Sequence, residues 1–313
     1  MENVLVRPIF GDGILIKVLT VGEFKRLDNK TVALIRLIRP QQWYKNLLVF
    51  IPAVYALSLF EYRLWPTMLL SFISACLVSG ANYILNDIHD LERDKRHPSK
   101  RFRPLPSGLV SPMEALAFCF FVLSVGFLSA YLVNQGFFLT ITTFFLVTQL
   151  YTFVLKRYPF VDIVTISFNY VIRAVAGAYA IEVPASPWLI VGIFFLALLL
   201  STGKRAGELM ELKEEAMEHR EVLRFYTEEW VSQGLTMAST LVILTYAIYC
   251  IEVHGSRLLP TLPLAVYLIM RYNHLVRSSP DMASNPHRLF SDKGFFSSFA
   301  LWLILTVLLL YLI

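Results

Sequence analysis

Long runs of apolar residues, separated by short charged segments, dominate the chain. The last nineteen residues, 295–313, contain no charged side chain. A helix of about 20 apolar residues crosses the hydrocarbon core of a bilayer, so such runs predict membrane spans. Nine spans are expected, with boundaries good to a few residues: 45–60, 66–86, 112–132, 137–155, 161–181, 187–203, 235–252, 258–272 and 295–313. The predicted fold is an all-α, polytopic membrane protein with about nine transmembrane helices.

Composition and charge support this interpretation. The chain is 56% hydrophobic and only 16% charged, whereas soluble domains carry about 25% charged residues. The net charge of +5 does not indicate a nucleic-acid partner, because the cations lie between apolar runs. Cys76, Cys119 and Cys250 all fall in predicted spans, and they are too few and too scattered for a disulfide or zinc framework.

The distribution of basic residues predicts the topology. Lys and Arg gather on the cytoplasmic side of membrane proteins. Five segments on one side hold 25 of the 28 Lys and Arg residues: 1–46, 87–111, 156–160, 204–234 and 271–294. Loops on the other side contain only Arg63 and Arg257. We therefore expect a cytoplasmic N-terminus and a C-terminus on the far side.

Two regions are expected along the chain. Residues 1–30 form a cytoplasmic N-terminal segment whose degree of order the pattern does not define. Residues 31–313 form one transmembrane domain, which begins with a short helix at 31–39 lying along the membrane surface.

The segment after the second predicted span carries an unusual set of carboxylates. Asp87, Asp90 and Asp94 are spaced i, i+3 and i+7, so they share one face of a helix that continues from that span. Asn86 precedes them, and Tyr83 lies one turn earlier. Stacked like charges repel one another unless a cation lies among them. Carboxylates that can act together with phosphate oxygens suit Mg²⁺, so the sequence predicts a magnesium site.

A basic cluster follows the carboxylates. Its members are Arg93, Lys95, Arg96, Lys100, Arg101 and Arg103. Metal-binding carboxylates next to cations are expected where a diphosphate binds through Mg²⁺. The alternative is that this segment is a solvated, charged helix end.

Further cations lie at the cytoplasmic ends of other spans. Lys45 and Asn46 stand at the mouth of the first, while Lys156 and Asp162 bracket the loop between the fourth and fifth. Lys156 could simply anchor the topology, and Asp162 could cap a helix. Arg173 is harder to explain in this way. It lies inside the fifth span, where a cation costs roughly 2.5–3.5 kcal/mol unless it faces a polar cavity or an anion.

The sequence N86-D-x-x-D-x-x-x-D94 at the end of the second span resembles the first aspartate-rich motif of the UbiA superfamily of intramembrane prenyltransferases. The resemblance covers almost the whole chain after residue 31. It implies a UbiA-like helical bundle with cytoplasmic active-site loops, in which this motif holds Mg²⁺ against a diphosphate. Members that transfer a prenyl group carry a second motif, roughly D-x-x-x-D, after the sixth span. Here Lys204 and Arg205 stand in that place.

Four further motifs narrow the resemblance. RPxQWxKN from Arg39, LKxxPxxD from Leu155, IRAxAG from Ile172 and GKRxxEL from Gly203 are similar to the polyprenyl-phosphate phosphoribosyltransferase branch of UbiA. This resemblance implies transfer of 5-phosphoribose from 5-phosphoribosyl 1-diphosphate to a decaprenyl-type polyprenyl phosphate, for cell-envelope polysaccharide precursors. It also implies that the protein lies in a bacterial inner membrane and has no nucleic-acid partner. A homo-oligomer is compatible with this resemblance.

The resemblance also implies roles for individual residues. Asp87, Asp90 and Lys204 are the expected catalytic groups, and Asp87, Asp90 and Asp94 are the expected Mg²⁺ ligands. The expected substrate-binding residues are Lys45, Asn46, Tyr83, Asn86, Lys100, Arg101, Arg103, Lys156, Asp162, Arg173 and Arg205.

Two other functions were considered. A UbiA-type enzyme that moves an isoprenoid onto an aromatic acceptor would carry a second aspartate-rich motif, which is missing here. A membrane transporter is the remote alternative. Neither an inverted repeat nor a pair of Gly/Pro-broken helices favours it, and a transporter has no evident use for metal-type carboxylates confined to one membrane face.

Overall fold

The computed structural model describes residues 30–312 except 99, 213–220, 254 and 285. The predicted N-terminal segment therefore lies almost entirely outside the described residues. Every regular element within the described part is a helix. The all-α prediction is confirmed.

Seven of the described helices are long and apolar enough to cross a membrane. They are α4 (Trp65–His89), α6 (Pro112–Val133), α7 (Gln135–Phe153), α8 (Val161–Ala180), α9 (Pro187–Leu212), α11 (Glu228–Glu252) and α14 (Lys293–Tyr311). Large apolar side chains cover the outside of several of them, as with Phe120 and Phe121 on α6. The protein is a multi-pass membrane protein.

The other two predicted spans have a different structure, so the count of nine is not confirmed. Residues 45–60 fall on the 3₁₀ helix η1 (Pro40–Phe50) and the short helix α3 (Ile51–Tyr55). A 3₁₀ helix rises about 2.0 Å per residue, so these two elements together cover about 30 Å. Residues 258–272 overlap α12 (Leu262–Ser278), which has 17 residues and carries Arg271.

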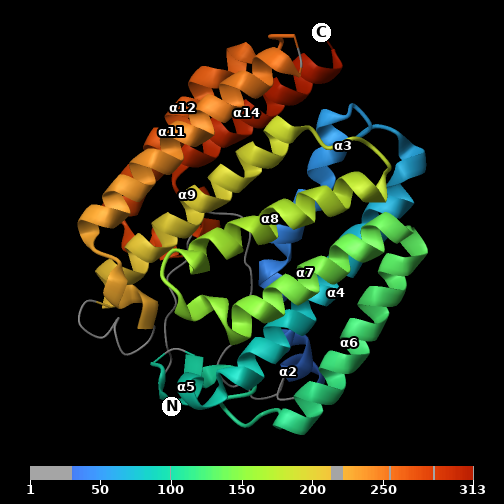
Figure 1. The fold of residues 1–313 in the computed structure, drawn as a ribbon, viewed down its shortest axis with the longest axis vertical. Helices are drawn as coiled ribbons and strands as arrows, with labels where there is room; N and C mark the ends of the chain where they lie inside the picture. Colours follow the sequence, from blue (N-terminus) through green and yellow to red (C-terminus); the bar gives the residue numbers. More distant parts are fainter. Residues whose placement is uncertain (1–29, 99, 213–220, 254, 285, 313) are drawn as a thin grey trace, which may run out of the picture.

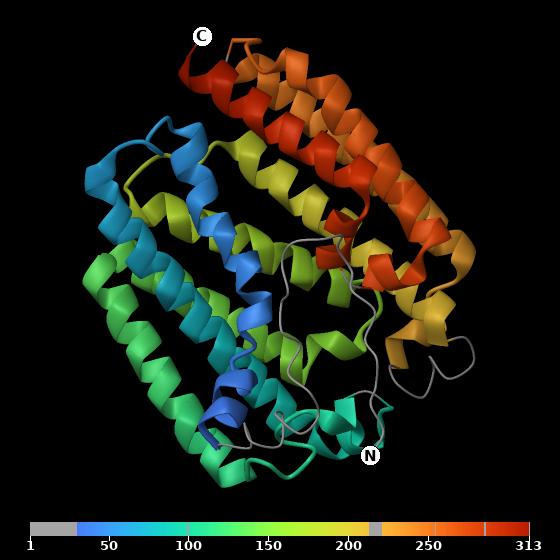
Figure 2. The same ribbon diagram turned by 180° about the vertical axis from the view of Figure 1, so that it is seen from behind.

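The helices form two groups that meet at α8 and α9 (Figure 1). One group, built on α4, α6, α7 and α8, shares a core with η1 and α3. The other joins α9 to α11 and α12, with α14 alongside (Figure 1). Seen from behind, η1 and α3 run along α4 (Figure 2). The protein is thus a bundle of two halves joined by the α8–α9 contact.

A close backbone approach fixes the register between η1 and α8. A Cβ atom on Gly177 would lie 2.1 Å from the carbonyl oxygen of Val49. Only glycine allows this distance, as at other tightly packed membrane helices. Arg173 is one turn before Gly177, and Asn46 is three residues before Val49. The contact therefore brings these two side chains together.

The charged loops gather at one end of the bundle. The short helix predicted at 31–39 is present as α2 (Lys30–Leu37). It lies at the same end as the short helix α5 (Leu91–Arg96), whereas the C-terminus lies at the opposite end (Figure 1). The polar chemistry of the chain is therefore concentrated at the α5 end.

Candidate active site

The predicted continuous helix through the three aspartates is interrupted. Helix α4 ends at His89, and α5 begins at Leu91, with Asp90 between them at φ −93° and ψ 9°. The backbone N–H of Asp94 still donates to the carbonyl of Asp90 at 2.8 Å, so the chain keeps a nearly helical path. The prediction of one shared helical face was wrong at this point, because the break lets Asp90 face a different partner from Asp87 and Asp94.

Asp87 and Asp94 meet at Arg103. Both carboxylates are buried, each residue being only 2% exposed. The Nη1 atom of Arg103 lies 3.3 Å from Asp87 and 2.8 Å from Asp94. Arg39 also donates to Asp87, and the Nζ atom of Lys100 lies 3.7 Å from Asp94. Residues 86–103, which we call the acid loop, therefore hold two buried carboxylates around one guanidinium group.

Asp90 is bound by Lys156 instead. The Nζ atom of Lys156, in η4 (Leu155–Arg157), donates to both carboxylate oxygens at 2.9 and 2.8 Å. It also lies 3.4 Å from the amide oxygen of Asn86. The expected substrate-binding residue Lys156 thus joins the loop between α7 and α8 to the acid loop.

Tyr83 and Arg101 each take part in a contact between a cation and an aromatic ring. The guanidinium of Arg39 stands 4.9 Å from the centre of the Tyr83 ring, so Tyr83 supports a cation that binds Asp87. Arg101 is exposed and stacks on Phe102 at 4.8 Å. Sequence reasoning missed Arg39 as a partner of Asp87, although its position in the RPxQW motif was a signal.

The donor set of the acid loop fits Mg²⁺ in chemistry. No group of three or more His, Cys, Asp and Glu in the described residues is arranged as a direct metal cage. Asp87 and Asp94 nevertheless approach the same Arg103 nitrogen, so a position between them already accommodates a cation. Carboxylate oxygens of this kind, completed by phosphate oxygens, are typical of Mg²⁺ sites. The carboxylates of Asp87 and Asp94 already lie together in this way, whereas the carboxylate of Asp90 binds Lys156.

Two cations of the acid loop, Lys100 and Arg103, are only partly compensated by its carboxylates. Burial lowers the pKa of Lys100, and the negative charge of Asp94 opposes this shift without cancelling it. Burial likewise lowers the pKa of Arg103, although Asp87 and Asp94 both act to raise it. A bound anion would further stabilise the charged forms of these side chains.

Arg173 is buried deep in the bundle and faces neutral groups. The residue is 6% exposed. Its Nε donates to the amide oxygen of Asn46 at 2.9 Å, and its Nη1 donates to the carbonyl of Asn169 at 3.0 Å. The guanidinium also stands 4.3 Å from the centre of the Phe144 ring. No carboxylate among the described residues forms an ion pair with Arg173, so its charge is without a counter-ion.

Asn46 connects Arg173 to η1 and α4. Its amide oxygen also accepts from Ser79 at 3.1 Å, and its amide nitrogen donates to the sulfur of Cys76 at 3.3 Å. The adjacent Lys45 is half-buried and within electrostatic range of Arg173 and Arg39. Two cations therefore lie close together at the inner side of η1.

The basic end of α9, residues 203–208, contains a paired cation. Arg205 is 1% exposed, and its Nε lies 3.1 Å from a carboxylate oxygen of Asp162, while Nη1 donates to Glu208. Asp162 also accepts a hydrogen bond from the hydroxyl of Tyr226, just after η6 (Glu221–Phe225). Arg205 and Asp162 were expected to bind substrate, and the structure pairs them with each other. Tyr226 was missed, because no local pattern links it to Asp162.

Lys204, the neighbour of Arg205, is in a different situation. It is half-buried, and it has no ion pair within the part of the chain that the structure describes. The negative charge of Glu208, one turn later on α9, acts on it, as do the positive charges of Lys45 and Lys100. A Cβ atom on Gly203 would lie 1.9 Å from the hydroxyl of Tyr272. This close contact between α9 and α12 fixes the position of Lys204.

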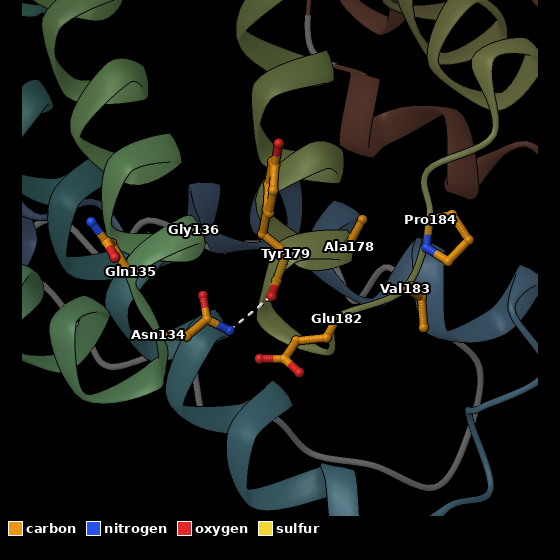
Figure 3. Close-up of a pocket in the computed structure, with 8 residues that line it drawn as sticks. All are labelled: Asn134, Gln135, Gly136, Ala178, Tyr179, Glu182, Val183 and Pro184. Atoms are coloured by element: carbon orange, nitrogen blue, oxygen red, sulfur yellow. Dashed lines mark hydrogen bonds between the residues drawn. The ribbon is translucent and has the colours of Figure 1, made fainter.

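A separate pocket lies at the opposite end of α8. It is an open cavity of about 520 Å³, lined by Asn134, Gln135, Gly136, Ala178, Tyr179, Glu182, Val183 and Pro184 (Figure 3). The side chain of Asn134 donates to the carbonyl of Tyr179 at 2.8 Å. Because a 20-residue helix spans about 30 Å, this pocket is remote from the charged groups and takes no part in the site.

Comparison with known proteins shows which family the chain resembles over most of its length. Residues 47–304 match the model of the UbiA prenyltransferase family. A decaprenyl-phosphate phosphoribosyltransferase of Mycobacterium tuberculosis is 30% identical over 72% of this chain and 76% of its own length. The enzyme of that name from Corynebacterium glutamicum is 32% identical over 72% of this chain and 70% of its own.

A solved structure shows the same fold. The UbiA homologue of Archaeoglobus fulgidus bound to GPP and Mg²⁺ superposes with a TM-score of 0.65. It is 21% identical, and the match covers 86% of this chain and 99% of that one. Divalent metal is therefore present in a structure of this fold. The chain belongs to the UbiA prenyltransferase family of membrane enzymes.

Proposed function

We propose that the enzyme transfers 5-phosphoribose from 5-phosphoribosyl 1-diphosphate to a polyprenyl phosphate and releases diphosphate. One observation carries the proposal. Lys45, Arg173 and Lys204 are buried or half-buried cations that pair with no carboxylate among the described residues. Such cations are costly inside a membrane protein unless an anion binds them. The proposed donor carries phosphate groups at both ends of the sugar, whereas a prenyl diphosphate carries them at one end.

The relatives support the same donor and acceptor. Both proteins cited above carry the name decaprenyl-phosphate phosphoribosyltransferase and cover most of this chain. The replacement of an acidic motif by Lys204 and Arg205 at the basic end of α9 fits a substrate with more negative charge. An isoprenoid donor would leave the cations Lys45 and Arg173 without a counter-ion.

In the proposed reaction a phosphate oxygen of the acceptor forms a bond to the anomeric carbon of ribose. The bond from that carbon to diphosphate breaks, and diphosphate leaves with the electron pair. Asp87, Asp90 and Asp94 are the residues that would hold Mg²⁺, which when bound neutralises charge developing on diphosphate. Lys100 and Arg103 lie beside these carboxylates, where they stabilise the same leaving group.

The cations that form no ion pair among the described residues, Lys45, Arg173 and Lys204, bind the other phosphates. Arg173 and Lys45 lie deeper than the acid loop and are placed to orient one phosphate. Lys204 lies on α9 about two turns before the helix ends at Leu212, within range of Lys45 and Lys100, and contacts the donor from the other half of the bundle. The acceptor phosphate is already anionic, so the reaction needs its orientation more than a general base.

We place the site at the cytoplasmic face of a bacterial inner membrane. The strong bias of Lys and Arg toward the loops at the acid-loop end supports this orientation. The soluble donor then enters from the cytoplasm, and the polyprenyl tail lies among the apolar helices. The C-terminus, at the opposite end of the bundle (Figure 1), lies on the far side.

The test is a transfer assay with purified protein in detergent. Labelled 5-phosphoribosyl 1-diphosphate is mixed with a polyprenyl phosphate and Mg²⁺, and label is followed into the lipid phase with and without EDTA. Transfer that EDTA abolishes is the expected result. The proposal fails if no label moves while a prenyl diphosphate is consumed with an aromatic acceptor.

A further inference from the structure

An amide pair in the interior of the bundle has unused hydrogen-bonding capacity. Gln149 of α7 donates from Nε2 to the Oδ1 atom of Asn82 on α4. Asn82 is only 3% exposed. The remaining Nδ2 of Asn82 and Oε1 of Gln149 are buried and have no hydrogen-bond partner. One donor and one acceptor therefore lie together inside the bundle.

The chemistry of this pair does not depend on how the amides are turned. If both side-chain amides are rotated, Asn82 becomes the donor in the shared hydrogen bond. One acceptor and one donor are again left over. Buried polar groups without partners are costly, so the pair is suited to a ligand group that both donates and accepts. A hydroxyl has this property, whereas an ionised phosphate only accepts and a hydrocarbon does neither.

On its outer side, the pair lies next to the acid loop. Asn82 is four residues before Asn86, which places the two amides on the same face of α4, one turn apart. Asn86 is the residue whose amide oxygen lies 3.4 Å from Lys156, and Lys156 also binds Asp90. The outer neighbour of the amide pair is therefore the region assigned to Mg²⁺ and diphosphate.

On its inner side, the pair lies next to the buried arginine. Asn82 is three residues after Ser79, so the two side chains lie about one turn apart on the same face of α4. The hydroxyl of Ser79 donates to the amide oxygen of Asn46 at 3.1 Å, and the same oxygen accepts from Nε of Arg173 at 2.9 Å. The amide pair thus lies between the acid loop and the unpaired cation Arg173.

We propose that Asn82 and Gln149 together bind a hydroxyl group on the pentose ring of the donor and so select a sugar donor over an isoprenoid diphosphate. This inference rests on the proposed function. 5-Phosphoribosyl 1-diphosphate has a diphosphate at one end, a phosphate at the other and ring hydroxyls between them. Its groups follow the same order as the acid loop, the amide pair and Arg173.

The first test needs only the unmodified protein with Mg²⁺. Ribose 5-phosphate, 2-deoxyribose 5-phosphate and 3-deoxyribose 5-phosphate compete against labelled 5-phosphoribosyl 1-diphosphate for binding. We expect one of the two deoxy sugars to compete about tenfold more weakly than ribose 5-phosphate. Equal competition by all three sugars overturns the inference.

The second test compares the donor with a ligand that has no sugar. Dissociation constants for 5-phosphoribosyl 1-diphosphate and for inorganic diphosphate are measured on Gln149→Met and Asn82→Leu. We expect the donor to bind about tenfold more weakly and diphosphate to change less than twofold. Thr142→Val is the control. Thr142 lies elsewhere on α7, and its hydroxyl donates to the carbonyl of Phe138. Both dissociation constants should stay unchanged in this variant.

The outcomes separate this inference from the proposed function. The amide pair has no role in selecting the sugar if the variants weaken the binding of both ligands equally, or of neither, while the unmodified protein transfers phosphoribose. If the unmodified protein neither binds the donor more tightly than diphosphate nor transfers label, the proposed function fails and the inference fails with it.

Discussion

The acid loop and the basic end of α9 lie within electrostatic range of each other, and they differ in how their charges are paired. In the acid loop each of the three aspartates is paired with a cation: Asp87 with Arg39, Asp94 with Arg103 of the loop itself, and Asp90 with Lys156. At the basic end of α9, Arg205 is matched by Asp162 and Glu208, whereas Lys204 forms no ion pair among the described residues and shares the charge of Glu208 at longer range. Under the proposed function, the donor supplies further negative charge beside Lys204.

Two adjacent residues of α9 show how a buried ion pair distinguishes a structural cation from one that can bind a ligand. Arg205 and Lys204 are both basic and both lie near the end of α9. Arg205 is almost fully buried between two carboxylates, so its charge is already used to join α9 to α8. Lys204 forms no ion pair within the described residues, and the proposed function assigns it to the donor. From the sequence, Lys204 was expected to be catalytic and Arg205 to bind substrate.

The largest effect is expected in the acid loop. Asp87→Asn and Asp90→Asn should each lower the transfer rate at least about 1,000-fold, because each removes a carboxylate that would hold the metal under the leaving group. The rate is measured with the labelled-donor assay at saturating Mg²⁺, and helical content is followed by circular dichroism. Glu92→Gln is the matched control, since Glu92 is exposed and pairs only with Lys95 in the described contacts. Near-normal Mg²⁺-dependent turnover in both aspartate variants would contradict the assignment of Asp87 and Asp90 as metal ligands.

Arg205→Met should affect folding more than binding. It leaves the buried carboxylates of Asp162 and Glu208 without their cation, and removal of one partner from a buried ion pair costs about 3–5 kcal/mol. Thermal unfolding in detergent measures the loss, and the donor dissociation constant is measured on the protein that remains folded. Unchanged stability together with lost donor binding would show that Arg205, rather than Lys204, contacts the substrate.

Lys204→Met should give the opposite result. We expect the donor to bind about 10- to 100-fold more weakly, because a charge-assisted contact to phosphate is lost, while the melting temperature changes little. Calorimetric titration with 5-phosphoribosyl 1-diphosphate measures the affinity. A variant that binds the donor normally would contradict the comparison between Lys204 and Arg205.

Tyr226→Phe should have the smallest effect. Its hydroxyl donates to Asp162 and accepts from the backbone N–H of Phe160 at 2.9 Å. Loss of this link should lower stability by about 1.5 kcal/mol and leave the donor affinity within about twofold. Thermal unfolding and titration on the same sample check both. A donor affinity that falls as far as in Lys204→Met would place Tyr226 in the substrate site.

The sequence predicted the features that depend on local pattern. Hydrophobic runs located the seven long helices, and the spacing of Asp87, Asp90 and Asp94 located the acid loop. The 3₁₀ form of η1 was not expected, because apolar composition gives length but not helix type. The turn of Asp90 toward Lys156 was also missed, since it depends on a residue 66 positions away.

Contacts between distant helices account for the rest. The pairing of Tyr226 with Asp162 and of Gln149 with Asn82 joins residues 64 and 67 positions apart. No periodicity links such pairs, because each depends on how the helices pack. The same holds for Arg173, where the sequence indicated a need for an anion or a polar cavity and the structure identified Asn46 and Asn169 as its neighbours.

The most direct test of the account is a competition between two donors for the unmodified protein. Binding of labelled 5-phosphoribosyl 1-diphosphate in the presence of Mg²⁺ is measured against increasing geranyl diphosphate. Under the proposed function Lys45, Arg173 and Lys204 bind phosphate groups at more than one position, so the phosphoribosyl donor should bind at least about tenfold more tightly. Tighter binding of geranyl diphosphate would contradict the proposal that Lys45, Arg173 and Lys204, which form no ion pair among the described residues, select a sugar donor.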